Sequence, residues 1–393
     1  MSTGMNRETP HSDSTIPAAE AGGILTINLN ALVANWLFLK SQAATAECAA
    51  VVKANAYGIG IEHAVPALLK AGCKTFFVAL LSEAKRVRNI TPDATIYVLN
   101  GLFADTETTY AAYNIRPVLG SIEELERWSL FCKHTGKKLP AALHIDTGMS
   151  RLGITPDDIS TVAQSPLLES FELSLLMSHF VSSEEPDNQL NQRQIDCFEN
   201  CRQLFPGIPA SLSNSSGILL ANAPTYDLLR PGYALYGGNP TPGKPNPMQE
   251  VVTLKGRIVQ IRTVPAGTSI GYNSRWITDG EMRLATISIG YADGYPRSTS
   301  GTKDKHLANK PAGIAVVSGE RCPFIGTVSM DLIIINITKI DPASVKVGDL
   351  VTLIGDGISV DDVGLSAGTN GYEVLTHLGK RYFRQYIGGD IDG

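Results

Sequence analysis

Residues 49–80 read A-A-V-V-K-A-N-A-Y-G-I-G-I-E-H-A-V-P-A-L-L-K-A-G-C-K-T-F-F-V-A-L. The stretch opens with a short apolar run typical of a buried strand. It continues with helical apolar spacing at 61–70 and ends with a second apolar run at 75–80. Strands buried on both faces read as continuous apolar runs, and a helix between two of them indicates one unit of a parallel sheet.

The same alternation continues to about residue 240. We predict strands at 49–53, 75–80, 95–100, 116–120, 141–146, 173–179, 210–215 and 227–230. Helical spacing separates most of them, and a further helix is expected at 29–40. At 121–134, Ser121 and Glu124 have the spacing of a capping box. Eight short strands over roughly 220 residues predict an α/β fold, a (β/α)8 barrel of the TIM type.

Residues 237–247 read G-G-N-P-T-P-G-K-P-N-P, a composition that predicts a linker. Beyond it, β-branched runs without helices between them indicate a mostly antiparallel β domain followed by two short helices. The expected strands are 251–264, 283–289, 312–318, 324–337 and 349–354, and the expected helices are 361–367 and 371–378. We therefore predict a disordered tail at 1–23, a barrel at 24–246 and a C-terminal β domain at 247–393.

Composition excludes several classes of protein. The net charge of −5 does not favour nucleic acid, which needs a basic surface. The chain has no apolar run of about 18 residues, so we expect no membrane span, and residues 1–22 lack the apolar centre of a signal peptide. Six cysteines without a C-x-x-C pair favour a cytoplasmic protein without a metal site.

Polar residues end five of the predicted barrel strands: Lys53, Asp146, His179, Asn214–Ser215 and Arg230. Each alone has a structural explanation, because a strand becomes polar where it leaves the core. Function in such barrels lies at the carboxyl ends of the strands, so five of them on one rim predict a site.

Two features of this rim point to a cofactor. The loops Asn214–Gly217 and Pro231–Tyr233 follow the seventh and eighth strands, where barrels often bind phosphate through backbone N–H groups and small hydroxyls. Lys53 closes an apolar strand, and desolvation there lowers a lysine's pKa and makes a nucleophile that forms Schiff bases. Together they predict pyridoxal 5′-phosphate. The other interpretation of Lys53 is a structural lysine whose ammonium reaches solvent.

The segment A-V-V-K-A-N-A-Y-G-I-G (50–60) resembles the cofactor-lysine signature of alanine racemases. Four further segments match the same family in the same order: H-I-D-T-G-M-S-R-L-G (144–153), L-R-P-G-Y-A-L-Y-G (229–237), I-G-Y-A-D-G-Y-P-R (289–297) and G-T-V-S-M-D (326–331). The resemblance covers residues 24–390. It implies a pyridoxal-phosphate enzyme with a barrel and a β domain, a head-to-tail homodimer that interconverts L- and D-alanine and supplies D-alanine for peptidoglycan.

The resemblance also implies residue roles. Lys53 would carry the cofactor and act as a base on one face of the substrate carbon, and Tyr291 of the partner subunit would act on the other. A second base is needed because a single base usually returns the proton to the face it came from. For the cofactor, the implied contacts are Tyr57, Ser215, Gly232, Tyr233 and Tyr372 at the phosphate, Arg230 at the pyridine nitrogen and Arg151 at the phenolic oxygen. For the substrate, Arg151 and Met330 would contact the carboxylate, and Asp331 and Tyr272 would line the access corridor. His179 and Arg230 would form a relay with Tyr291.

The sequence departs from the family pattern at two positions. His144 stands where many members carry a lysine modified as a carbamate, so Arg151 needs another means of support. Ile59 replaces a histidine of the lysine signature. Related racemases of broader specificity also lack the carbamate-modified lysine that His144 replaces, which leaves a mixed alanine and serine racemase as an alternative.

Three further alternatives are open at this point. A pyridoxal-dependent decarboxylase on the same barrel would not need Tyr291. A non-enzymatic pyridoxal carrier would resemble only the barrel half. A barrel enzyme acting on a phosphorylated sugar would lack the visible absorbance of a bound pyridoxal.

Overall fold

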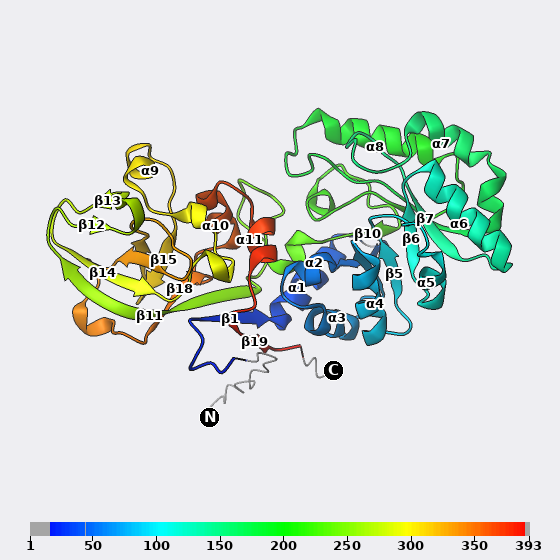
Figure 1. The fold of residues 1–393 in the computed structure, drawn as a ribbon. Coiled ribbons are helices and arrows are strands. Elements are labelled where there is room, and N and C mark those ends of the chain that lie inside the picture. Colours follow the sequence, from blue (N-terminus) through cyan, green and yellow to red (C-terminus); the bar gives the residue numbers. More distant parts are fainter. Residues whose placement is uncertain (1–15, 44, 390–393) are drawn as a thin grey trace, which may run out of the picture. The chain divides into compact units, whose positions relative to one another are not determined.

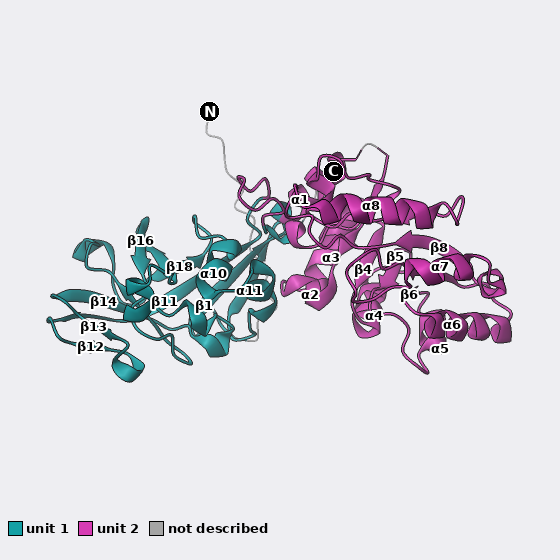
Figure 2. Ribbon diagram, turned by 90° about the horizontal axis from the view of Figure 1, so that it is seen from above, with its two compact units in different colours: residues 1–31, 236–238, 249–390 teal, residues 32–235, 239–248, 391–393 magenta. Residues whose placement is uncertain are grey.

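The computed structural model describes residues 16–43 and 45–389 (Figure 1). The chain divides into two compact units (Figure 2). Unit 1 comprises residues 1–31, 236–238 and 249–390, and unit 2 comprises residues 32–235, 239–248 and 391–393. Most of the tail expected at 1–23 lies outside the described residues. None of the helices in the described part of the chain is long and apolar enough to cross a membrane.

Unit 2 contains the strands of the parallel barrel sheet. They are β2 (Glu47–Cys48), β3 (Ala50–Val51), β4 (Thr75–Val78), β5 (Thr95–Val98), β6 (Arg116–Leu119), β7 (Pro140–His144), β8 (Glu172–Met177), β9 (Ala210–Ser211) and β10 (Leu228–Leu229). Strands β3 to β9 pair in chain order, and β10 pairs in parallel with β2.

Backbone hydrogen bonds close this sheet into a barrel. The N–H of Asp227 donates to Ala210 at 3.0 Å, which joins β10 to β9. The N–H of Ala49 donates to Leu229 at 2.9 Å, which joins the first strand to β10. The eight-stranded α/β barrel is thereby confirmed, and each predicted strand is present, most of them shorter than expected.

Helices cover the barrel sheet, and all but the first of them follow a barrel strand (Figure 1). They are α1 (Leu29–Ser41), α2 (Lys53–Tyr57), α3 (Ile61–Lys70), α4 (Leu81–Ile90), α5 (Glu107–Ala112), α6 (Ile122–Thr135), α7 (Pro156–Ala163) and α8 (Gln189–Arg202), with 3₁₀ turns η1 (Pro166–Ser170), η2 (Gly217–Leu219) and η3 (Tyr233–Tyr236). The barrel core is apolar: Phe76, Ile96, Leu143 and Leu176 have no exposed surface.

The capping box predicted at α6 is half correct. The Ser121 hydroxyl accepts from the N–H of Glu124 at 3.3 Å, as expected. The Glu124 carboxylate instead accepts from Gly120 at 2.7 Å and from Leu102, in the preceding strand–helix loop, at 2.8 Å. This glutamate therefore joins two loops of the barrel.

Unit 1 is a mostly antiparallel β structure. Its strands are β1 (Gly23–Asn28), β11 (Val252–Val264), β12 (Ser269–Ile270), β13 (Trp276–Ile277), β14 (Met282–Ile287), β15 (Ile314–Val317), β16 (Glu320–Pro323), β17 (Ile333–Asn336), β18 (Leu350–Ile354) and β19 (Phe383–Ile387). The helices are α9 (Lys303–Leu307), α10 (Val360–Ala367) and α11 (Gly371–His377), and the 3₁₀ turns are η4 (Tyr272–Ser274), η5 (Tyr291–Asp293), η6 (Arg297–Thr299) and η7 (Pro342–Ser344). The long β11 pairs antiparallel with β1, β14 and β18.

Three details of unit 1 differ from the sequence expectation. Strand β1 lies within the range assigned to the barrel, yet it pairs with β11 and, in parallel, with β19, because Leu25 and Ile27 are buried in this sheet. The strand expected at 324–337 is reduced to β17, and turns precede it. Helix α9 occupies a region expected to lack helices.

Candidate active site

Lys53 lies two residues after the first barrel strand, at its carboxyl end. Burial lowers the pKa of the Lys53 ammonium, and the positive charge of Arg151 lowers it further, while Glu83 acts in the opposite direction. A lysine with a lowered pKa is uncharged more often at neutral pH and is a better nucleophile and base.

The chain after Lys53 follows an unusual path. Ala54, Asn55, Ala56 and Tyr57 all have φ between 50° and 58°, so four successive residues are left-handed without a glycine among them. Left-handed geometry costs roughly 1–2 kcal/mol per residue, or roughly 4–8 kcal/mol for the turn, less whatever the asparagine tolerates. Strain of this kind persists only where neighbouring groups hold it, and it concentrates at functional sites.

Arg230, at the end of β10, is 3% exposed. Its guanidinium donates to the Ser211 hydroxyl, to the Ser178 carbonyl and, at 3.4 Å, to the Leu212 carbonyl. Burial alone lowers the pKa of Arg230 to about 9, with no carboxylate among the described residues to offset it. The side chain is therefore a buried cation at neutral pH whose own partners are neutral.

The positive charges of Arg230 and Arg151 also act on two histidines, His144 and His179. Burial and the charges of Arg230 and Arg151 lower the pKa of His144 to about 4. Burial, followed by Arg230, Arg151 and Lys53, holds the pKa of His179 well below its usual value. Both imidazoles are neutral at pH 7, so the positive charge at this rim comes from Arg230, Arg151 and Lys53 and suits an anionic ligand.

The loops after β9 and β10 form a small cradle. The Ser215 hydroxyl accepts from the N–H groups of Gly232 at 3.0 Å and Ala234 at 3.2 Å. The Asn214 side-chain oxygen accepts from Gly217 at 2.9 Å. A Cβ at Gly232 would lie 2.5 Å from the hydroxyl oxygen of Tyr57, so glycine is needed for that hydroxyl to reach the loop.

Arg151 lies on a loop that Asp146 organises. One carboxylate oxygen of Asp146 accepts from the N–H groups of Gly148, Met149 and Ser150 at 2.8 to 3.1 Å. The hydroxyl of Thr147, in the same loop, contacts Ser178 at 2.7 Å and accepts from the buried Gln194 at 3.1 Å. These contacts support the Arg151 loop in a chain whose His144 cannot carry a carbamate.

Tyr291 and Met330 lie in unit 1 on adjoining segments. The N–H of Tyr291 donates to Ser329 at 3.1 Å, and the N–H of Ala292 donates to Met330 at 2.9 Å. Their side chains are 41% and 53% exposed. Tyr372, at the start of α11, belongs to the same unit.

Arg381 joins these two segments. It pairs with Asp293, two residues after Tyr291, at 3.2 Å and with Asp331, beside Met330, at 2.9 Å. The Asp293 carboxylate in turn accepts from the N–H of Gly290 at 2.8 Å.

Within unit 2 the structure brings together the predicted site residues Lys53, Tyr57, Arg151, His179, Asn214, Ser215, Arg230, Gly232 and Tyr233, while Tyr291, Met330 and Tyr372 belong to unit 1. Glu83, Gln194 and Arg381 escaped sequence reasoning. A glutamate or arginine in a polar stretch carries no signal of the loop that it contacts in the folded chain.

Comparison with known proteins identifies relatives over nearly the whole chain. The family described as "Alanine racemase, N-terminal domain" matches residues 27–240, and "Alanine racemase, C-terminal domain" matches residues 251–386. A protein of Methylobacterium sp. (strain 4-46) named "Alanine racemase" is 53% identical over 93% of this chain and 98% of its own length. One of Agrobacterium fabrum named "Alanine racemase, catabolic" is 44% identical over 94% and 93%.

A solved structure agrees with these relatives. The alanine racemase from Bartonella henselae, described with covalently bound pyridoxal phosphate, has a TM-score of 0.87 and 39% identity. The alignment covers 93% of this chain and all of that one.

Proposed function

The chain belongs to the alanine racemase family and is a pyridoxal-phosphate-dependent enzyme that interconverts L- and D-alanine, and from this premise we propose the role of each site residue in binding and proton transfer. The proposal rests above all on one observation, the lysine at the end of β3 with a lowered pKa beside the Gly232 cradle. The match to both domains counts against a carrier with the barrel alone.

The residues of the rim fit pyridoxal phosphate. The missing side chain at Gly232 lets the Tyr57 hydroxyl approach the loop after β10, next to the Ser215 hydroxyl that accepts from Gly232. Hydroxyl and N–H donors gathered in this way would hold a phosphate. Arg230, buried with neutral partners, would face the pyridine nitrogen, and Lys53 would hold the aldehyde carbon. When bound, the cofactor withdraws electrons from the amino acid and weakens its Cα–H bond.

The protein's own residues then move the proton. The Lys53 Nζ accepts or donates it on one face of the Cα, helped by the lowered pKa of that amine. The Tyr291 hydroxyl serves the opposite face. Arg151 and the backbone at Met330 orient the substrate carboxylate, and neutral His179 with cationic Arg230 takes part in a relay with Tyr291.

A chiral assay tests the activity and its residue assignment. The purified enzyme with added pyridoxal phosphate is incubated with L-alanine, D-alanine and both serine enantiomers, and the enantiomers are separated by chromatography. We expect racemisation of alanine, and loss of cofactor absorbance and turnover in Lys53→Ala. A Lys53→Ala protein that still racemises alanine would refute the assignment. Serine turnover at a comparable rate would establish the mixed racemase.

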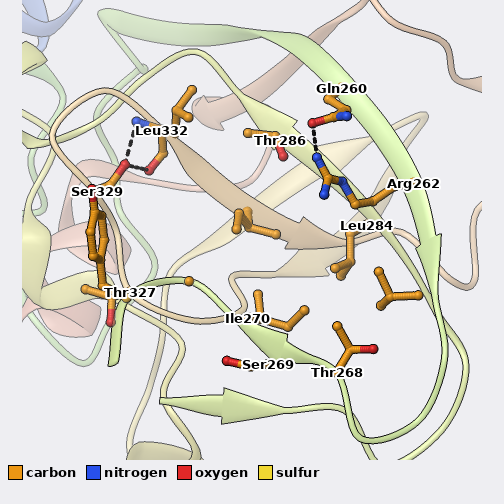
Figure 3. A pocket seen from close by; sticks show the side chains of 14 residues that line it. Gln260, Arg262, Thr268, Ser269, Ile270, Leu284, Thr286, Thr327, Ser329 and Leu332 are labelled. Carbon is orange, nitrogen blue, oxygen red and sulfur yellow. Dashed lines mark hydrogen bonds between the residues drawn. The ribbon is translucent and has the colours of Figure 1, made fainter. Parts of the chain in front are cut away.

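The active unit is proposed to be a head-to-tail homodimer. Unit 1 has a hollow of about 490 Å³ lined by β11, β12, β14 and the 327–334 segment, as Figure 3 shows. Its lining includes Tyr272 and Leu332, which are 69% and 40% exposed, and Ser329, which accepts the N–H of Tyr291. Exposed apolar surface of this kind is typical of a protein interface. A second copy docked here would receive Tyr291 and Met330 at its barrel.

Mixing two inactive variants tests this arrangement. Lys53→Ala and Tyr291→Phe each remove one base, and a mixed dimer with shared sites has one site with both defects and one with neither. After subunit exchange we expect about a quarter of wild-type activity, because half of the dimers are mixed and each has one intact site. If the exchanged mixture is no more active than the two variants measured separately, the proposal that two subunits share each active site is wrong.

The proposed cellular role is to supply D-alanine for peptidoglycan in the cytoplasm. The relatives at 53% identity are named without the word "catabolic", which appears for two relatives at 43% and 44%. The catabolic role is therefore the second candidate. A need for added D-alanine after deletion of the chromosomal gene supports the biosynthetic role, and expression that appears only when alanine is the carbon source favours the catabolic one.

A further inference from the structure

Glu83, near the start of α4, joins the loop after β4 to the Lys53 turn. One carboxylate oxygen accepts from the N–H groups of Ala79 at 3.0 Å and Leu80 at 3.1 Å. The other accepts from the N–H of Asn55, in the left-handed turn, at 3.4 Å. The turn that follows Lys53 is therefore attached to the neighbouring strand–helix loop through one carboxylate.

The side chain of Asn55, the same residue, makes further contacts outside the turn. Its Oδ1 accepts from the N–H of Ile61, which opens α3, at 3.2 Å and from Arg86 of α4 at 2.6 Å. Arg86 is in turn fixed by two hydrogen bonds to Glu62, at 2.8 and 2.7 Å. The centre of the turn is thus bonded to both helices that flank it.

We propose that Glu83 and Asn55, with Arg86 behind them, are positioning residues that keep the 54–57 turn left-handed and thereby set the spacing between Lys53 and the Tyr57 hydroxyl. The inference rests on the proposed roles of Lys53 and Tyr57 as anchors for the two ends of pyridoxal phosphate. These anchors lie at opposite ends of the turn, so a change in its handedness would move one relative to the other.

The unfavourable backbone is the reason that outside support is needed. The residues Ala54, Ala56 and Tyr57 have no preference for positive φ, and the intrinsic choice of such a segment is right-handed. Bonds within the turn, such as that from Gly58 to Ala54 at 2.9 Å, close it without selecting its hand on their own. The contacts to Glu83 and Arg86 come from outside the turn and are compatible with the observed hand.

The chain supplies a matched control in Glu124. This glutamate near the start of α6 also accepts from its own loop, at Gly120, and from the preceding loop, at Leu102. Neither loop carries a left-handed turn of this length or a proposed cofactor anchor. Glu124→Gln therefore removes the same type of inter-loop contact without touching the Lys53 turn.

The variants Glu83→Gln, Asn55→Ala, Asn55→Asp and Glu124→Gln test the proposal in the full-length protein. Pyridoxal phosphate affinity is measured by titrating the visible absorbance of the bound cofactor, and amide hydrogen exchange is measured in the cofactor-free protein. Because the loss of one partly buried hydrogen bond weakens an equilibrium about fivefold to tenfold, we expect that change in Glu83→Gln and a larger one in Asn55→Ala. Exchange at residues 54–58 should accelerate by a similar factor.

The controls separate positioning from general stability. Asn55→Asp keeps the acceptor oxygen for Ile61 and Arg86, so we expect it to restore affinity to within about twofold of wild type. Glu124→Gln should lower thermal stability without changing the cofactor affinity. The proposal fails if Glu83→Gln and Asn55→Ala bind and exchange like wild type, or if Glu124→Gln weakens the cofactor equally.

Failure of the underlying assignment has its own signature. If Lys53→Ala retains the visible absorbance of the bound cofactor, the role of Lys53 is wrong whatever the other variants do. If Lys53→Ala loses it while Glu83→Gln and Asn55→Ala are unaffected, the assignment stands and the positioning role is overturned.

Discussion

Replacement of Gly232 by alanine tests the cradle most directly. An alanine Cβ would lie 2.5 Å from the Tyr57 hydroxyl oxygen, 3.3 Å from the ring carbon that carries it and 3.5 Å from the Cβ of Val51. Favourable contacts between carbon atoms lie at about 3.5–4.0 Å, so the Tyr57 hydroxyl must retreat by roughly 1 Å. Tyr57 is 7% exposed and its backbone belongs to the left-handed turn, so it has little room to do so.

The expected cost has two parts. Overpacking of this kind destabilises the cofactor-free protein by about 1–3 kcal/mol. The displaced hydroxyl would also lose the hydrogen bond that we propose it makes to the charged phosphate, and a bond of that kind is worth about 1.5–3 kcal/mol. The second part alone weakens the binding of pyridoxal phosphate by about tenfold to a hundredfold, since each 1.4 kcal/mol is a factor of about ten.

Titration of the visible cofactor absorbance and thermal denaturation of the cofactor-free protein measure the two parts separately. Gly280→Ala is the matched control, because a Cβ there meets no atom within 4 Å. Tyr57→Phe in the Gly232→Ala background removes the oxygen that clashes, so it should recover thermal stability without recovering cofactor affinity. A Gly232→Ala protein that binds the cofactor as tightly as wild type would refute the reasoning.

Three further changes have defined outcomes. The pKa of His144 is about 4 in the folded chain and near 6.5 when exposed, so the unfolded chain binds more protons between these values and the free energy of unfolding falls as the pH is lowered. In denaturant melts at pH 7 and pH 5, wild type should lose about 2 kcal/mol that His144→Gln does not lose. Ala54→Gly, at an exposed left-handed position, should raise stability by about 0.5–1 kcal/mol. Ala112→Gly, at the exposed last residue of helix α5, should lower stability, by at most about 1 kcal/mol. Thermal melts in which both variants change stability in the same direction would contradict the strain at Ala54. Arg381→Met leaves the Asp293 carboxylate without its cation, so turnover should fall at least about tenfold while the absorbance of the bound cofactor is unchanged. Steady-state kinetics with unaltered kcat and KM would exclude a catalytic role for the Arg381–Asp293 pair.

The barrel was predictable because its strands are buried on both faces and therefore read as apolar runs. Strand β1 was not, although its residues G-I-L-T-I-N alternate between buried and partly exposed positions. Its antiparallel partner is β11, where Leu25 lies opposite Leu254. A pairing between such distant segments depends on the folded sheet, and a local pattern carries no information about it.

The rim residues of the site were predictable for a related reason. A polar residue at the end of a buried strand marks the carboxyl rim, and Lys53, His179 and Arg230 were found in that way. The conformation that aims them was not predictable. The left-handed turn contains no glycine, and glycine is the residue that signals positive φ in a sequence.

Glu83 and Glu124, which each bond to two loops, show why the capping-box pattern predicted only one of the two contacts at α6. Ser121 and Glu124 have the sequence of a capping box, but the Glu124 carboxylate bonds to Gly120 and to the preceding loop. Glu83 makes the same type of contact although the residue three positions before it is Leu80, which has no capping side chain. The shared determinant is therefore the position of the glutamate in the first turn of a barrel helix. There it faces N–H groups of two adjacent loops, so the strain of one loop is supported by its neighbour in the barrel.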